Sequence, residues 1–198
     1  MDEQTIHRLN QINREFYQIT ATSFDESRNQ PWPGWERILP HLHPPLSVLD
    51  VGCGNGRFGA FLAQQFGLQI NYTGLDSNLV LLERAQHALT GLKGVTAQLE
   101  ARDIIEQPPN TGEYDLVALF GVLHHVPGRQ QRRDFMQILA QRVKPGGLLA
   151  IAAWRFYDFE RFRDRVVPWP DDITVEAHDY LLDWRRGETA LRYCHFVD

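Results

Sequence analysis

The chain has 198 residues, of which 43% are hydrophobic and 23% are charged, and its formal net charge is −5. This length fits one α/β domain with a sizeable core, and the composition is ordinary for a soluble globular fold. No apolar run approaches the roughly 20 residues of a membrane helix, and the polar residues 1–4 are unlike a secretory signal. The acidic balance argues against a bulk electrostatic nucleic-acid binder, and we expect a cytoplasmic protein.

The cationic residues are nearly all arginines, because only Lys93 and Lys144 are lysines. Arginines gather at 129–133 and at 155–165. Two interpretations stay open: these are solvated helix faces, or they are guanidinium groups that bind carboxylates or phosphates. The two cysteines, at 53 and 194, form neither a metal-ligand spacing nor a disulfide framework.

Residues 1–45 are predicted to be mostly helical. Residues 3–20 carry apolar side chains at three- and four-residue spacing, which predicts an amphipathic helix. Residues 21–33 are polar and end in Pro-Trp-Pro, which predicts a loop. Residues 35–42 are expected to form a second short helix.

From residue 47 onward, short apolar strands alternate with helices. The predicted strands are 47–51, 70–76, 95–99, 114–120 and 148–154. The predicted helices are 58–66, 77–89 with Ser77 as its cap, and 129–142, which is closed by a turn at 144–147. This alternation predicts βαβ units with right-handed crossovers, and therefore an α/β fold with a doubly wound, mostly parallel sheet.

The pattern is weaker after residue 154. We expect helix at 155–165, a break at 168–172, a turn at 184–187 and a strand at 191–197. The whole chain, 1–198, is expected to form a single domain. Its parts are a helical cap at 1–45, a cofactor-binding core at 46–154 and a substrate-side segment at 155–198.

The main chemical signal is a glycine-rich loop directly after the first strand. Gly52, Gly54 and Gly56 alternate with Cys53 and Asn55, and such glycines permit tight turns and a close backbone approach to a ligand. The G-x-G-x-G spacing differs from the G-x-G-x-x-G of dinucleotide enzymes. Asp50, inside the strand end, would repel a pyrophosphate. It suits a cationic ligand such as the amino-acid end of S-adenosylmethionine.

Two further acids follow the next two strands. Asp76 ends the second strand, where a carboxylate can accept hydrogen bonds from both hydroxyls of a ribose. An acid at this position can also cap a helix, although Ser77 can do so as well. Asp103 follows the third strand and can accept from an adenine amino group, while the backbone of Ile104 meets the ring.

Phe120 to His125 mark the end of the fourth strand, where a transferred methyl group is expected to lie. The two histidines, His124 and His125, are interpreted as a general base, a metal pair or polar filling. No third ligand is evident in the sequence, so we expect no metal. We favour His125 as the residue that faces the pocket and as the candidate catalytic residue.

Taken in order, these motifs resemble the class I S-adenosylmethionine-dependent methyltransferase superfamily. The resemblance covers residues 47–154 and includes the Lys144-Pro145-Gly146-Gly147 element. It implies a Rossmann-like fold with S-adenosyl-L-methionine as the cofactor. The cofactor-binding residues would then be Asp50, Gly52, Cys53, Gly54, Gly56, Asp76, Ser77, Asp103, Ile104 and Phe120.

A narrower resemblance extends beyond this core. Residues 21–28 with Pro31-Trp32-Pro33, the paired histidines followed by Arg132-Arg133, Val167-Pro168-Trp169, and Arg192-Tyr193-Cys194-His195 are similar to the wobble-uridine tRNA carboxyl methyltransferases, which esterify 5-carboxymethyluridine. The resemblance implies a tRNA acceptor and a small activating partner protein. It also implies that Tyr17 and Arg28 close over the cofactor. The residues near the substrate would be Trp154, Arg155, Trp169, Arg192 and His195.

The sequence departs from that family in two places. Cys194 stands where an aromatic residue is usual, and the family continues with a helix and two more strands that this chain is expected to lack. The fifth strand would then form an exposed edge unless residues 191–197 cover it. Two other functions stay open: a methyltransferase for small molecules, and a module that binds S-adenosylmethionine without catalysis. A dehydrogenase is disfavoured by the loop spacing.

Overall fold

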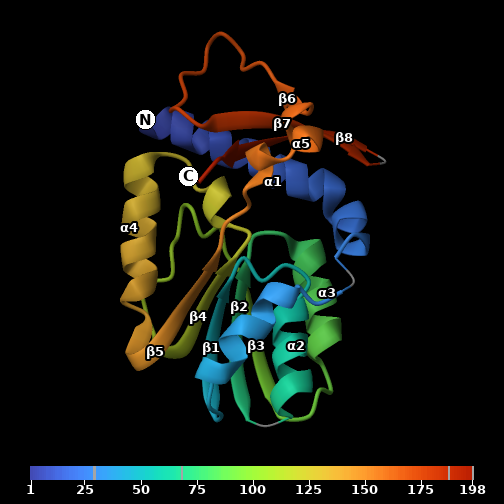
Figure 1. Cartoon of the computed structure of the whole chain (residues 1–198), viewed down its shortest axis with the longest axis vertical. Helices are drawn as coiled ribbons and strands as arrows, with labels where there is room; N and C mark the ends of the chain where they lie inside the picture. The colour runs from blue at the N-terminus through green and yellow to red at the C-terminus, as the bar shows by residue number, and fades with distance from the viewer. Residues whose placement is uncertain (29, 68, 187, 198) are drawn as a thin grey trace.

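The chain folds into a five-stranded sheet flanked by helices, with a smaller cap stacked on one end (Figure 1). The computed structural model describes residues 1–28, 30–67, 69–186 and 188–197. Within these ranges, no helix is both long enough and apolar enough to cross a membrane.

The helices and the strands have the following bounds. The helices are α1 (Glu3–Glu26), α2 (Arg57–Phe66), α3 (Leu79–Leu89), α4 (Arg129–Ala140) and α5 (Glu160–Arg163), with 3-10 helices η1 (Pro33–His41), η2 (Leu123–His125) and η3 (Phe156–Asp158). The strands are β1 (Leu46–Val51), β2 (Ile70–Asp76), β3 (Val95–Ala101), β4 (Tyr114–Phe120), β5 (Val143–Ala152), β6 (Val166–Val167), β7 (Asp179–Arg186) and β8 (Glu188–His195).

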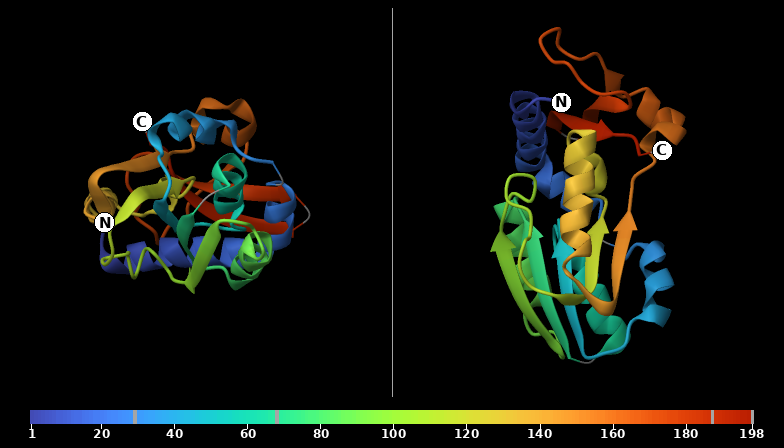
Figure 2. Two further views of the ribbon diagram at one scale, coloured as in Figure 1. Left: turned by 90° about the horizontal axis from the view of Figure 1, so that it is seen from below. Right: turned by 90° about the vertical axis from the view of Figure 1, so that its left-hand side faces the viewer.

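The larger sheet is parallel throughout and has the order β3-β2-β1-β4-β5. The chain winds outward from β1 to β3 and then returns to place β4 on the other side of β1. This reversal is the switch point of a doubly wound sheet, and ligands bind beyond the carboxyl ends of the strands at such a point. The predicted fold class is confirmed. In Figure 2 the cap lies over this end of the sheet.

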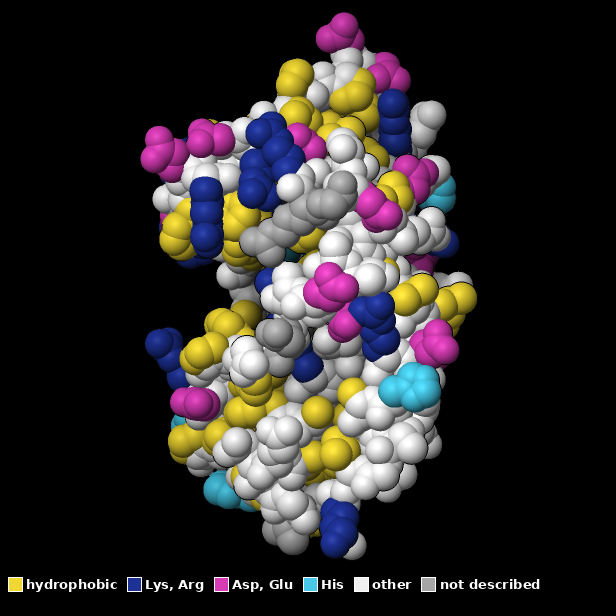
Figure 3. Space-filling model, turned by 90° about the vertical axis from the view of Figure 1, so that its right-hand side faces the viewer, with side chains coloured by type: hydrophobic (Ala, Val, Ile, Leu, Met, Phe, Trp, Pro, Cys, Tyr) yellow, Lys and Arg dark blue, Asp and Glu magenta, His cyan; other side chains and the backbone are white. Residues whose placement is uncertain are grey.

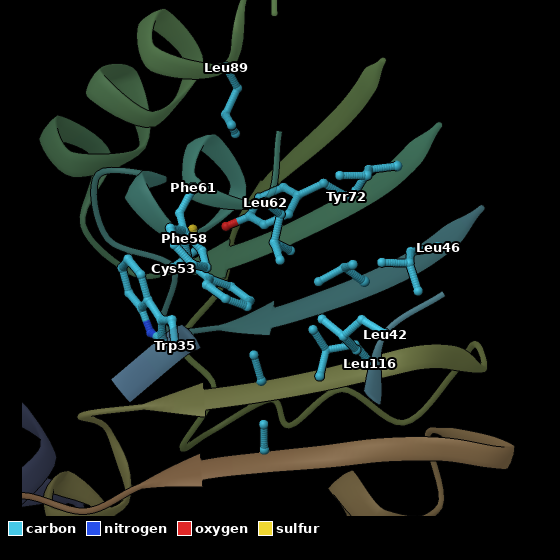
Figure 4. Close-up of a cluster of buried hydrophobic side chains, with 14 of the residues drawn as sticks. Trp35, Leu42, Leu46, Cys53, Phe58, Phe61, Leu62, Tyr72, Leu89 and Leu116 are labelled. Carbon is cyan, nitrogen blue, oxygen red and sulfur yellow. The ribbon is translucent and has the colours of Figure 1, made fainter. Parts of the chain in front are cut away.

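Two apolar clusters cover the two faces of the sheet, because side chains alternate along each buried strand. Val48 faces the cluster formed with α2, α3 and η1, whereas its neighbour Leu49 faces the cluster formed with α4. In Figure 4 the aromatic rings of Trp35, Phe58 and Phe61 gather in the first cluster. The paired clusters fix the sheet and thereby the positions at which its strands end.

The cap consists of α1 packed against β8 of a three-stranded antiparallel sheet with the order β6-β7-β8. Leu9 and Tyr193 are fully buried in this contact. The side-chain oxygen of Asn13 in α1 accepts a hydrogen bond from the backbone N–H of Tyr193, at 2.9 Å. The cap therefore joins the first and last segments of the chain into one unit.

Two predicted boundaries in the first half of the chain are wrong. Helix α1 runs to Glu26, so residues 21–26 of the loop predicted at 21–33 are helical. Its polar end is held by side-chain contacts, in which Asp25 receives hydrogen bonds from Asn55 and Arg84. Helix α3 is capped by Asn78, whose side chain accepts from the N–H of Leu81, and not by Ser77.

The second half of the chain departs from prediction mainly at its turns. The predicted turn at 144–147 is the start of β5, which begins at Val143. The turn predicted at 184–187 is wrong for residues 184–186, because Trp184 pairs with Ala190 in the β7–β8 hairpin, and residue 187 lies outside the described residues. The strand predicted at 191–197 does not cover β5, because β8 pairs with β7 in the second sheet.

Candidate active site

An open cavity lies between the carboxyl ends of the parallel strands and the cap. Its empty space is about 1050 Å³ including the solvent at its mouth, which is enough for a ligand of nucleoside size. Helix α1, the glycine loop and the ends of β1, β2 and β4 contribute its walls. Of the predicted cofactor residues, the lining includes Tyr17, Arg28, Asp50, Gly52, Cys53, Gly54, Asp76, Ser77, Asp103, Ile104 and Phe120.

The glycine loop folds tightly against the end of β2. The backbone N–H groups of Gly52 and Cys53 both donate to the carbonyl oxygen of Leu75, at 2.8 and 2.9 Å. Gly54 has a φ of +54°, and a side chain built on it would meet no atom within 4 Å. Because Gly54 lines the cavity, a side chain there would project into the space that a ligand needs.

Gly56 has a different role, because it is not among the residues that line the cavity. A Cβ atom on Gly56 would lie 2.9 Å from Cβ and 3.0 Å from Cα of Ala85 in α3. Gly56 therefore permits close packing of the loop against α3. Gly56 was predicted to bind the cofactor. Its position indicates an indirect contribution, through support of the loop.

Asp50 lies buried at the end of β1, with only 3% of its surface exposed. Its Oδ2 accepts a hydrogen bond from the hydroxyl of Tyr72 in β2, at 2.5 Å. Burial raises the pKa of Asp50 to about 7, although the Tyr72 bond opposes this shift. A cationic group in the cavity would favour the ionised form, so Asp50 is suited to a ligand that carries an amino group.

Asp76 is oriented by the loop that it faces. Its Oδ2 accepts from the N–H of Gly54 at 2.8 Å, and its Oδ1 accepts from the N–H of Asn78 at 2.9 Å. A carboxylate oxygen can accept more than one hydrogen bond, so both oxygens keep capacity for a diol. Burial raises the pKa of Asp76. The arrangement fits the predicted contact with ribose hydroxyls.

Asp103 connects the sheet to the cap. Its Oδ1 accepts from the N–H of Ile105 at 3.0 Å, and its Oδ2 accepts from the side-chain amide of Asn10 in α1 at 2.9 Å. Arg14 of the same helix lies 3.5 Å from this oxygen. Helix α1 therefore closes the cavity over the position predicted for an adenine, next to the buried Ile104.

His125 faces the cavity, and both of its ring nitrogens are already engaged. Nδ1 lies 2.9 Å from the carbonyl oxygen of Tyr193, which can only accept, so Nδ1 carries the proton. Nε2 therefore accepts from the hydroxyl of Tyr17, at 3.0 Å. Burial and the nearby Arg192 lower the pKa of His125 to about 3. A neutral imidazole with this pKa, hydrogen-bonded at both nitrogens, is a weak general base.

His124 is buried beside His125, and its Nδ1 has no hydrogen-bond partner within the part of the chain that the structure describes. Nitrogen and sulfur atoms of His124, His125 and Cys194 lie within 4.8 Å of one another. This third potential ligand could not be found from sequence spacing. Burial, the neighbouring His125 and the charge of Arg192 lower the pKa of His124, and the same guanidinium would repel a metal cation.

Arg192 lies in an aromatic box next to this cluster. Its guanidinium carbon is 4.4 Å from the ring centroid of Trp154, 4.9 Å from that of Phe16 and 5.9 Å from that of Trp184. Only 7% of its surface is exposed. Among the described residues no carboxylate pairs with it, and its Nε has no hydrogen-bond partner. A buried cation without an acid partner is costly, and an anionic ligand would offset that cost.

None of the five residues predicted near the substrate, Arg192 included, is among the residues that line the cavity. Trp169 packs in the cap and donates from its ring N–H to the carbonyl oxygen of Asp179. His195 contacts the carboxylate of Asp179 at 2.8 Å. Arg155 pairs with Asp158 on the surface. Of this group, Trp154 forms part of the aromatic box around Arg192, and the structure places the other three elsewhere.

Several residues that shape the site carry no recognisable motif. Asn10 and Arg14 contact Asp103, Tyr72 bonds Asp50, and the side-chain amide of Asn78 donates to the carbonyl oxygen of Tyr17. A polar residue on the apolar face of an amphipathic helix, such as Asn10, is the one available sequence signal. The partners of these residues lie far away in the chain, so that signal identifies a buried contact without identifying its target.

Comparison with known proteins identifies the family. The sequence profile described as "Methyltransferase domain" matches residues 49–149, just over half of the chain. The chain belongs to this methyltransferase family. The matched residues include the end of β1, the glycine loop, Asp76, Asp103 and the paired histidines. The predicted family is confirmed, and S-adenosylmethionine as the predicted cofactor agrees with this membership.

Solved structures show the same fold. A crystal structure of an S-adenosylmethionine-dependent methyltransferase from Methanosarcina mazei superposes with a TM-score of 0.62 at 22% identity. The superposition covers 84% of this chain and 78% of that one. At this identity the similarity shows the methyltransferase fold alone.

Curated relatives of the methyltransferase match most of this chain. The human "Probable tRNA methyltransferase 9B" is 26% identical over 85% of this chain and 35% of its own length. The mouse "tRNA (carboxymethyluridine(34)-5-O)-methyltransferase ALKBH8" is 27% identical over 78% of this chain and 20% of its own length. A "tRNA U34 carboxymethyltransferase" of Geobacter is 32% identical over 68% of this chain and 41% of its own length. The matches therefore span less than half of each of these relatives.

Proposed function

We propose that this protein transfers the methyl group of S-adenosylmethionine to a carboxylate on a modified wobble uridine of tRNA, forming a methyl ester. The observation that carries the choice of acceptor is the buried Arg192, which has no acid partner among the described residues. It lies close enough to Tyr17 and His125 on the cavity wall to affect the pKa of both. A planar guanidinium suits bidentate recognition of a carboxylate.

The cofactor half of the proposal rests on the acids around the glycine loop. The cavity offers Asp50 to an ammonium group, Asp76 to a ribose and Asp103 to an adenine, in the order in which these groups occur along the cofactor. When bound, the cofactor supplies a methyl group on a positively charged sulfur, which a nucleophile attacks in line. The bare surface at Gly54 leaves room for this ligand. Tyr17 and Arg28 reach the same cavity from the cap side.

The acceptor half requires little acid–base chemistry. A carboxylate is already ionised near pH 7, so no side chain has to remove a proton from it. The geometry of His125 agrees with this, because its Nδ1 proton is held by Tyr193 and its Nε2 by Tyr17. The remaining tasks are to orient the carboxylate with Arg192 and to exclude water, which accelerate such a transfer through positioning.

The names of two relatives support a tRNA acceptor, and one of them also supports the carboxylate. The mouse relative is named for carboxymethyluridine at position 34 of tRNA, and the human relative is named a probable tRNA methyltransferase. Each match covers most of this chain. The carboxylate named for the mouse enzyme is the group that Arg192 is suited to bind.

The test uses the purified protein with radiolabelled S-adenosylmethionine and two tRNA preparations. One carries 5-carboxymethyluridine at position 34, and the other is an unmodified transcript of the same sequence. The proposal predicts label only in the modified tRNA and loss of that signal when the sample is first treated with ribonuclease and the nucleotides are removed. Equal labelling of both preparations would contradict a carboxylate acceptor. Labelling of small molecules from a cell extract, with none in tRNA, would contradict an RNA acceptor.

A further inference from the structure

The segment between β5 and the cap carries an exposed stack of arginine and phenylalanine side chains. Phe159 is 51% exposed. The guanidinium carbon of Arg161 lies 5.7 Å from the ring centroid of Phe159 and 4.8 Å from that of Phe162. Among the described residues, no carboxylate pairs with Arg161. The surface therefore combines an open aromatic face with an available positive charge.

A second exposed aromatic residue, Trp32, lies next to the cavity on a different segment. It is 44% exposed, and its ring centroid is 6.1 Å from that of Phe120, which lines the cavity. Its indole ring packs directly on the backbone of Gly34, where a Cβ atom would come within 2.2 Å of the ring. The ring is thus held in one orientation while part of its surface stays open to solvent.

The two aromatic sites belong to the ends of neighbouring strands. Phe120 at the end of β4 pairs with Ala152 at the end of β5, and the chain passes from there through Trp154 to Phe162, whose ring lies 4.7 Å from that of Trp154. Figures 1 and 2 place α5 and η1 on the same side of the molecule, one in each of its two parts. Figure 3 shows a hollow between these parts, with hydrophobic and basic side chains on both of its sides.

We propose that Trp32 and the segment 155–165 dock a single-stranded RNA loop, with bases stacked on Trp32 and Phe159 and phosphates bound by Arg161 and Arg163. This inference rests on the proposed function, because it describes how an RNA acceptor is held at that site. Single-stranded RNA is recognised through bases stacked on aromatic rings and arginine planes and through its phosphates. Exposed aromatic rings with stacked arginines fit this partner.

The charge of the segment sets the expected strength of the contact. It holds four arginines and three acids, and one of those acids, Asp158, is paired with Arg155. Glu160 and Asp164 remain on the same surface. We therefore expect a small number of phosphate contacts, with stacking as the main source of affinity. The dependence of the dissociation constant on salt should be shallow, with a slope of about one to two on logarithmic axes.

The experiment measures binding of a fluorescent RNA stem-loop that carries no carboxymethyl group, by anisotropy, in the absence of cofactor. Wild type is compared with Trp32→Ala, Phe159→Ala and Arg161→Glu. The matched controls are Lys93→Glu, at the opposite end of the sheet, and Ile19→Ala, an exposed apolar residue of α1. Each site variant should raise the dissociation constant about tenfold, as expected for the loss of one base-stacking ring or of one arginine charge. The controls should change the dissociation constant less than twofold.

A conservative variant and a small acceptor separate docking from folding and from chemistry. Phe159→Trp keeps a stacking surface and should bind like wild type. The site variants should methylate free 5-carboxymethyluridine nucleoside at the wild-type rate. If wild type fails to methylate the nucleoside or tRNA but the binding pattern holds, the proposed function fails and the docking surface stands. Absence of RNA binding by wild type, or equal effects of Lys93→Glu and Arg161→Glu, would overturn the docking proposal.

Discussion

Replacement of Asp50 by asparagine is expected to stabilise the protein in the absence of ligand. Asp50 is 3% exposed, and burial raises its pKa from the ordinary 3.8 to about 7. The folded state therefore keeps a proton on Asp50 between about pH 4 and pH 7, whereas the unfolded state has lost it. Because the unfolded chain binds fewer protons in this range, the free energy of unfolding falls as the pH rises from 4 to 7.

The size of this effect follows from the two pKa values. They differ by about three units, and each unit corresponds to 1.36 kcal/mol, so ionised Asp50 costs about 4 kcal/mol of stability above pH 7. Asparagine resembles the protonated form, and its side-chain oxygen can still accept the hydrogen bond from Tyr72. We therefore expect Asp50→Asn to be more stable than wild type by about 4 kcal/mol at pH 8 and by nearly nothing at pH 4.

Urea unfolding, followed by tryptophan fluorescence at pH 4, 6 and 8, measures this difference. Asp115→Asn is the control of opposite sign: burial raises the pKa of Asp115, but hydrogen bonds from Ser47 and Lys144 lower it on balance, so its loss should destabilise at neutral pH. A stability difference between Asp50→Asn and wild type that stays constant from pH 4 to pH 8 would refute the reasoning. Calorimetry on the same variant should show that S-adenosylmethionine binds at least tenfold more weakly at pH 8, and that binding by wild type weakens below pH 7 as Asp50 becomes protonated.

Three other changes test the remaining parts of the site. Gly54→Ala should weaken cofactor binding more than tenfold. The control Gly146→Ala should leave the affinity unchanged, because Gly146 has a similar left-handed backbone and open space but lies away from the cavity. Calorimetric titration measures both affinities, and equal losses would count against a ligand contact at Gly54. Arg192→Lys should raise the KM for the carboxylate acceptor about 10- to 100-fold through loss of a bidentate contact, with the cofactor affinity unchanged, and an unaltered KM would remove Arg192 from acceptor binding. His125→Asn should lower kcat less than tenfold and leave the pH dependence of kcat near neutrality as in wild type, because His125, with a pKa of about 3, does not titrate there, whereas complete loss of turnover in a folded, cofactor-binding variant would favour base catalysis by His125.

The sequence was sufficient to predict the core of the fold, because local patterns determine it. Strands that alternate with helices from residue 47, and glycines placed after the first strand, have a physical meaning that needs no distant partner. For the same reason Asp50, Asp76 and Asp103 could be assigned to one cavity: each lies at or just beyond the end of a parallel strand, and such strands end at a common edge.

Features that depend on distant contacts could not be predicted. The segment Trp184-Arg185-Arg186 has the composition of a turn, yet it lies in β7 because Trp184 packs against Phe16 of α1. In the same way, α1 continues to Glu26 where Asp25 meets Asn55 and Arg84. Tertiary contacts override local preference at both positions.

The interpretation of the paired histidines shows a similar limit. Sequence order alone favoured His125 as the pocket residue, and the structure agrees in its position while engaging both of its nitrogens. The orphaned Nδ1 of His124 and the proximity of Arg192 arise from the return of β8 toward η2, many residues later in the chain. No spacing rule links these positions.

The chemical stability of the methylated product is the most direct test of a carboxylate acceptor in RNA. tRNA methylated with radiolabelled S-adenosylmethionine is treated with mild alkali, which hydrolyses an ester but leaves methyl groups on ring nitrogen, carbon or ribose oxygen in place. We expect the label to leave the nucleoside fraction as volatile methanol. Label that stays on the nucleosides after this treatment would contradict it.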